Sequence, residues 1–86
     1  LKAGYDIKEA SSINQLKKTT VPILFIHGSD DNFVKTYMVY KNYDAKANGD
    51  KDILIVKDAG HAMAEIENPK QYYGKIEEFL SRYGLL

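Results

Sequence analysis

Two short, unbroken runs of apolar residues mark the chain. The first covers residues 21–26 (VPILFI), apart from Pro22, and stops at Gly28, and the second is the centre (ILIV) of a strand predicted at residues 52–57 (DILIVK). Runs of this length between turn residues are typical of strands buried on both faces of a parallel sheet. Pro22 stands at the entry of the first strand, where a missing N–H group is tolerated.

The segment that follows each run has the spacing of an amphipathic helix. Thr36 to Ala47 repeats apolar residues at intervals of three and four, and Asn48-Gly49 is a suitable terminator. The last helix begins at Asn68-Pro69, with asparagine as N-cap and proline in the first turn, and ends at Gly84. We expect the tyrosine stripes of both helices to lie in the core. The apolar positions are Tyr37, Val39, Tyr40, Tyr43 and Ala47 in the first helix and Tyr72, Tyr73, Ile76, Phe79, Leu80 and Tyr83 in the last.

The order strand, helix, strand, helix predicts an α/β fold with a parallel pair of strands and a right-handed crossover. Residues 1–18 form a polar lead-in, in which Ser11 or Ser12 can cap a short helix that ends near Lys18, and residues 19–86 form the βαβα unit. Parallel strands need helices on both faces and neighbouring strands. Residues 1–86 therefore read as one part of a single domain with a larger, doubly wound, mostly parallel sheet.

The composition excludes several classes of function. Twelve basic and twelve acidic side chains cancel, so the chain lacks the basic surface that nucleic acid or an anionic membrane selects. No stretch approaches the roughly 20 apolar residues of a transmembrane helix, and no signal-peptide pattern is present. The absence of cysteine excludes disulfides and thiolate chemistry. We favour a cytoplasmic location. An extracytoplasmic location stays open, because Leu1 is not an initiator methionine and an N-terminal portion could be missing.

Acidic and imidazole side chains follow the two predicted strands. Asp31 comes after the first strand and His61 after the second, and ligands of open parallel sheets bind at these carboxyl ends. A carboxylate beside an imidazole fixes its tautomer and stabilises its charged form. We therefore predict an acid–base pair, against the alternatives of an Asx-turn aspartate and a turn histidine satisfied by backbone groups. We expect Asp30 to be a solvated carboxylate, and His27 to be structural, packed under the loop.

The same segments carry a family resemblance. Residues 21–34 (VPILFIHGSDDNFV) resemble the seventh-strand segment of α/β-hydrolases, whose pattern is P-hydrophobic run-H-G-x-x-D-x-x-V-P. Residues 59–62 (AGHA) are similar to the G-H element after the eighth strand, and residues 67–80 to the last helix, from its E-x-P entry to its F-L ending. The resemblance covers residues 20 to 83. It is closest to the serine esterase and acyl-peptidase-like branch with a prolyl-oligopeptidase type of C-terminus.

This resemblance implies that the parent protein is a serine hydrolase that cleaves esters or amides through an acyl-enzyme. Asp31 then matches the catalytic acid and His61 the catalytic base, in the family's chain order of nucleophile, acid and histidine. No G-x-S-x-G is present, and Lys35 stands where a proline is common after Val34. We therefore expect the chain alone to be inactive, with the nucleophile and the oxyanion hole in a missing N-terminal part. The serines that lack the strand-to-helix elbow are Ser11, Ser12, Ser29 and Ser81.

The expected ligands and partners follow from this assignment. Phe33, Val34 and Met63 flank the acid–base pair and can line an apolar substrate pocket, although core packing accounts for them equally well. The expected partners are the missing N-terminal part and a small ester or acyl-peptide substrate. Neither a cofactor nor a metal is expected.

Two alternatives belong to other classes of function. Asp30 and Asp31 after a buried strand can bind Mg²⁺, as in a phosphoryl-transfer receiver, but no third acid or companion lysine is placed for it. The chain can also be a non-catalytic interaction or oligomerisation module, since a half-sheet exposes a strand edge through which a homo-oligomer forms.

Overall fold

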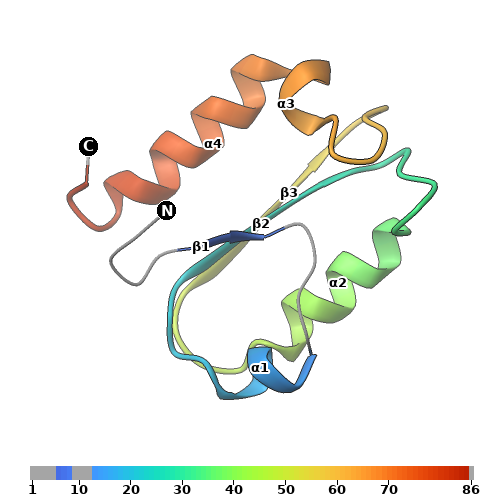
Figure 1. Cartoon of the computed structure of the whole chain (residues 1–86). Helices are drawn as coiled ribbons and strands as arrows, with labels where there is room; N and C mark the ends of the chain where they lie inside the picture. Colours follow the sequence, from blue (N-terminus) through green and yellow to red (C-terminus); the bar gives the residue numbers. More distant parts are fainter. Residues whose placement is uncertain (1–5, 9–12, 86) are drawn as a thin grey trace.

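The computed structural model describes residues 6–8 and 13–85 and contains one parallel sheet with helices on both faces (Figure 1). The strands lie in the order β1–β2–β3, with β2 paired in parallel to both neighbours. Helices α1 and α2 cover one face of the sheet, and α3 and α4 cover the other. The elements are β1 (Asp6–Lys8), α1 (Ile13–Lys18), β2 (Ile23–Gly28), α2 (Thr36–Ala45), β3 (Lys51–Val56), α3 (Ala64–Glu67) and α4 (Pro69–Ser81).

The central strand β2 is buried along its whole length, which confirms the interpretation of its apolar run. Its side chains alternate between the two faces, as the pleat of a strand requires. Leu24 and Ile26 belong to one core cluster with Phe79 of α4, whereas Ile23 and Phe25 belong to a second one with residues of α1 and α2. The α/β layer arrangement expected from the sequence is therefore present, but β3 is not buried as expected: it lies at the edge of the described sheet, and of its residues only Val56 is fully buried.

Two elements were not predicted. β1 is a three-residue strand that pairs with β2, with Ile7 opposite Leu24. Its sequence is polar and too short to show a period, so its strand conformation depends on the partner strand rather than on its own pattern. α3 is a single helical turn between the second strand and the last helix. Ser11 and Ser12, the expected caps, lie outside the described residues.

The expectation that the tyrosine stripes lie in the core is wrong for three of the tyrosines. Tyr37 and Tyr40 of α2 are 64% and 47% exposed, and Tyr73 of α4 is 48% exposed. The buried face of α2 consists instead of Val39, Asn42 and the C-cap Lys46, with Tyr43 partly buried beside them. The expectation is thus correct for Val39 and Tyr43, but because Asn42 and Lys46 are polar, a pattern of apolar residues alone places the centre of the buried face incorrectly.

Helix α4 has the predicted ends. The Asn68 side chain accepts a hydrogen bond from the backbone N–H of Gln71 at 3.1 Å, and Pro69 is the first helical residue. Gly84, at φ 70°, follows the last turn. In the part of the chain that the structure describes, no helix is long and apolar enough to cross a bilayer.

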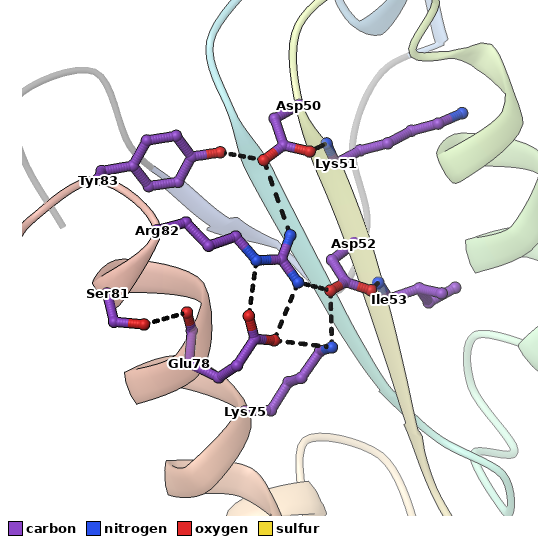
Figure 2. Close-up of polar contacts among 9 residues, drawn as sticks. All are labelled: Asp50, Lys51, Asp52, Ile53, Lys75, Glu78, Ser81, Arg82 and Tyr83. Atoms are coloured by element: carbon purple, nitrogen blue, oxygen red, sulfur yellow. Dashed lines mark hydrogen bonds and ion pairs between the residues drawn. The ribbon is translucent and has the colours of Figure 1, made fainter.

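A network of charged side chains fastens the C-terminal half of α4 to the start of β3 (Figure 2). Asp52 of β3 accepts from the Lys75 ammonium at 2.6 Å and from the Arg82 guanidinium. Arg82 also binds Glu78 one turn earlier, at 2.6 Å between Nε and Oε2, which makes an i,i+4 pair along the helix. Tyr83 donates to Asp50, just before β3.

Candidate active site

The carboxyl ends of β2 and β3 lie against each other. The Ser29 N–H donates to the Val56 carbonyl at 3.0 Å, and the Asp30 N–H donates to the Ala59 carbonyl at 2.9 Å. The loop after β2 therefore continues alongside the loop after β3. Gly28 permits this approach, since a Cβ there would stand 2.2 Å from the Ala59 oxygen.

The adjoining loops bring Asp31 and His61 into contact. Oδ2 of Asp31 lies 2.8 Å from Nδ1 of His61, although the residues are 30 positions apart. The other carboxylate oxygen, Oδ1, accepts the backbone N–H groups of Phe33 and Val34, each at 2.8 Å. Asp31 thus makes an Asx turn and the contact with histidine at once, one through each oxygen. Its side chain is 1% exposed and that of His61 is 44% exposed.

Hydrogen bonds keep the Asp31 carboxylate charged despite its burial. Burial alone would raise the pKa of this carboxyl group, but the N–H of Val34, the His61 ring and the N–H of Phe33 outweigh it, so the pKa lies below its usual value. An ionised carboxylate can only accept hydrogen bonds, so the proton between the two residues is on Nδ1 of His61. In the neutral imidazole, Nε2 is then left as a proton acceptor.

His27 lies beneath the loop, as expected, and is 1% exposed. Its Nε2 is 2.6 Å from the Val34 carbonyl oxygen and 3.3 Å from Oδ2 of Asp31. Its Nδ1 is buried and has no hydrogen-bond partner among the described residues. This histidine therefore contacts the same loop and the same carboxylate as His61, but from inside the sheet.

The three residues predicted to line a pocket differ from one another in exposure and in contacts. Phe33 is 83% exposed, and its ring stands edge-on to the His61 ring with 5.3 Å between the centroids. Met63 is 46% exposed, two residues beyond His61. Val34 is only partly exposed, and its carbonyl is bound to His27. Phe33 thus offers apolar surface next to the imidazole, Met63 offers exposed apolar surface two residues further along the chain, and Val34 binds His27 through its backbone.

The remaining polar residues of the two loops do not extend the pair. Asp30 is exposed, as expected. The two serines within the described residues bond elsewhere, Ser29 Oγ to the N–H of Asp58 and Ser81 Oγ to the Glu78 carbonyl. Within residues 6–8 and 13–85, no three histidine, aspartate or glutamate side chains form a group that could hold a metal ion. The described part of the site therefore consists of a buried carboxylate and an exposed imidazole in contact, an arrangement that can accept and return a proton.

Comparison with known proteins gives relatives for this arrangement. The model of the prolyl oligopeptidase family matches residues 2–84. An uncharacterized protein of Bacillus subtilis (strain 168), YqkD, is 32% identical over 80 residues, which make up 93% of this chain and 26% of YqkD.

Solved structures of esterases share the fold. The esterase Pf2001 of Pyrococcus furiosus, solved in two crystal forms, matches with a TM-score of 0.74 and 25% identity, over 81% of this chain and 28% or 27% of its own. The esterase Est2 of Thermogutta terrifontis matches with a TM-score of 0.62 and 22% identity, over 76% of this chain and 26% of its own, which shows the fold alone. The chain thus spans about a quarter of the length of these relatives. It has part of an α/β-hydrolase fold, and it belongs to the prolyl oligopeptidase family.

Proposed function

We propose that the whole protein is a serine hydrolase that cleaves esters or amides through an acyl-enzyme, with Asp31 and His61 as the acid and base of a Ser-His-Asp triad. Family membership and the esterase neighbours support a hydrolase. The observation that carries the finer proposal is the 2.8 Å contact between Oδ2 of Asp31 and Nδ1 of His61. A triad needs this contact, because it leaves Nε2 as the atom that receives the proton of the nucleophile.

In the proposed reaction, a serine from the rest of the protein attacks the acyl carbon. Nε2 of His61 takes the hydroxyl proton and then gives it to the leaving alcohol or amine, which departs as the acyl-enzyme forms. A water molecule then attacks the acyl-enzyme in the same way. Its proton passes through Nε2 of His61 to the serine oxygen, and the carboxylic acid product leaves as the bond to serine breaks. Asp31 stabilises the imidazolium in both steps, and its depressed pKa keeps it charged at neutral pH.

The proposed substrate is a small ester or an acyl-peptide, with its apolar part against Phe33 and Met63. Both side chains are exposed, and the Phe33 ring contacts the His61 ring. Val34 contributes through its backbone, which supports the turn of the acid. The nucleophile and the oxyanion hole are proposed to lie in the part of the protein that this chain does not include, so the 86 residues alone should not hydrolyse esters.

The test uses the full-length protein and p-nitrophenyl acetate. His61→Ala should lower kcat by roughly a thousandfold or more, since the attacking serine loses its general base. Asp30→Asn, in the exposed acid next to Asp31, is the matched control and should keep the activity. A fluorophosphonate should label the full-length protein at one serine, and it should not label the 86-residue chain. Unchanged hydrolysis by His61→Ala would overturn the proposal.

A further inference from the structure

We propose that His27 is a positioning residue for the acid–base pair, which holds the turn that presents Asp31 to His61. This inference rests on the proposed function and adds a third side chain to it. His27 touches neither the substrate nor the serine. It acts through the backbone of Val34 and through the buried side of the Asp31 carboxylate.

The His27 ring carries its proton on Nε2. A carbonyl oxygen can only accept a hydrogen bond, so the 2.6 Å contact between Nε2 and the Val34 carbonyl requires the proton to be on Nε2. The same N–H group lies 3.3 Å from Oδ2 of Asp31, the oxygen that accepts from His61. A polar donor therefore borders that oxygen from the buried side, opposite the exposed imidazole.

A series of hydrogen bonds connects His27 in the sheet with Asp31 and His61. His27 is in β2, paired in register with Ile55 of β3. Its ring binds the carbonyl of Val34, while the N–H of Val34 binds Oδ1 of Asp31 at 2.8 Å. The path from His27 through Val34 and Asp31 to His61 thus runs from a buried strand to an exposed ring.

His27 is buried, in contrast to most of the loop that it contacts. Most of the loop between β2 and α2 is exposed, including Asp30, Asn32 and Phe33. Among the described residues, the side chains in polar contact with Asp31 are those of His27 and His61. Of these two, only His27 is buried, so it is the one whose position is fixed by packing.

The nature of the residue supports a role beyond packing. The second ring nitrogen of His27, Nδ1, is buried without a hydrogen-bond partner among the described residues. An apolar side chain of similar size would avoid that desolvation, so stability by itself does not favour histidine at this position. The bond from Nε2 is what an apolar side chain cannot supply.

The experiment compares His27→Leu with His27→Gln in the full-length protein. Leucine fills the space without a donor, whereas the glutamine amide keeps one near Nε2. We expect His27→Leu to lower kcat for p-nitrophenyl acetate about tenfold or more, with KM within about twofold, because the orientation of the acid matters most when His61 becomes charged. His27→Gln should restore kcat to within about threefold of the wild type on the same reasoning. Thr36→Val, which removes a different bond to this loop, at 3.2 Å to the Gly28 carbonyl, should keep kcat.

A second readout does not depend on turnover. The proton between Nδ1 of His61 and Asp31 should give a low-field ¹H NMR resonance in the wild type and in His27→Gln, and this resonance should broaden or disappear in His27→Leu. If His27→Leu does not fold, His27→Asn replaces it, because the shorter amide does not reach the Val34 carbonyl.

Three outcomes would count against the inference. A wild-type kcat in His27→Leu would overturn it, and so would a retained low-field resonance in that variant. Equal losses of kcat in the leucine and glutamine variants would show that His27 acts only through packing. His61→Ala separates this failure from that of the proposed function. If His61→Ala is inactive while His27→Leu is fully active, only the role of His27 is wrong, whereas an active His61→Ala overturns the triad itself.

Discussion

Gly28 and Ala59 approach each other so closely that no side chain fits between them. A Cβ on Gly28 would stand 2.2 Å from the Ala59 carbonyl oxygen and 2.9 Å from its Cβ. Gly28 ends β2 three residues before Asp31, and Ala59 precedes His61 by two. The approach of these two backbones therefore sets the separation of the loops that carry the acid–base pair.

Gly28→Ala should destabilise the protein by about 2 kcal/mol, because either β2 or the loop after β3 must shift to admit a methyl group. It should also lower the ester hydrolysis proposed for the full-length protein, since the shift separates Asp31 from His61. The free energy of unfolding from urea titrations measures the first effect. Gly74→Ala is the matched control, because nothing lies within 4 Å of its Cβ position. In the interior of α4 this change should stabilise by about 0.5–1 kcal/mol, and a loss equal to that of Gly28→Ala would contradict the explanation.

If Asp31 is the acid of the proposed triad, Asp31→Asn should lower kcat by about ten-thousandfold in the full-length protein. The amide oxygen can still accept the N–H groups of Phe33 and Val34, so the turn should persist. What changes is the imidazole, which loses the charged acceptor that holds its proton on Nδ1. Kinetics with a p-nitrophenyl ester and a thermal melt of the same sample separate the two effects. A melting temperature that falls in step with kcat would point to unfolding instead.

The apolar runs of β2 and β3 and the end signals of α4 are local properties of the sequence, and they predicted these elements. The strand β1 could not be found in this way, since Asp6–Lys8 is short and polar and is ordered by pairing with β2. The buried face of α2 was predicted only in part: Val39 and Tyr43 pack in the core, but the polar residues Asn42 and Lys46 are buried beside them in place of Tyr37 and Tyr40. The burial of Lys46 is compensated by hydrogen bonds from its ammonium to the carbonyl oxygens of Thr19 and Asn48, and the burial lowers its pKa.

The contact between Asp31 and His61 could be predicted because each residue lies in the loop after a predicted strand. The bond of His27 to the Val34 carbonyl could not, since it depends on the path of the loop. A sequence gives the order of Asp31 and His61, but only the fold gives the two oxygens of Asp31 their separate partners.

Asp52→Asn should show how the network of Figure 2 depends on pH. Burial alone would raise the pKa of Asp52, but Lys75, the N–H of Ile53 and Arg82 hold it below its usual value. Since the folded pKa lies below the unfolded one, the stabilisation is complete above about pH 4 and is lost as the pH falls through the folded pKa.

Wild type and Asp52→Asn should therefore differ by about 1 kcal/mol in unfolding free energy at pH 7 and converge near pH 2. Urea titrations over this range measure the difference. Asp44→Asn, in an exposed acid of α2, is the control and should change stability by less than about 0.5 kcal/mol. A difference between wild type and Asp52→Asn that stays constant from pH 7 to pH 2 would contradict the assignment.

The outer edge of β3 bears on the proposal that the chain associates through its sheet. The carbonyls of Asp50 and Val56 accept N–H groups of β2 and the loop after it, so by alternation the backbone groups of Lys51, Ile53 and Ile55 face away from β2. The outward N–H groups of Lys51 and Ile53 donate to the side chains of Asp50 and Asp52, each at 2.8 Å. These carboxylates are held in turn by residues of α4 and the turn after it (Figure 2).

Two of the three outward N–H groups on this edge thus already donate to a side chain of the same chain, which disfavours strand addition there. The double variant Asp50→Ala/Asp52→Ala frees both N–H groups, and we expect it to self-associate at concentrations where the wild type does not. Light scattering over a concentration series of the full-length protein measures the difference. Glu78→Gln weakens the pair with Arg82 but leaves both backbone bonds in place, so it should behave as the wild type does. If Glu78→Gln associates as strongly as the double variant, the ion pairs rather than the occupied N–H groups keep the edge closed.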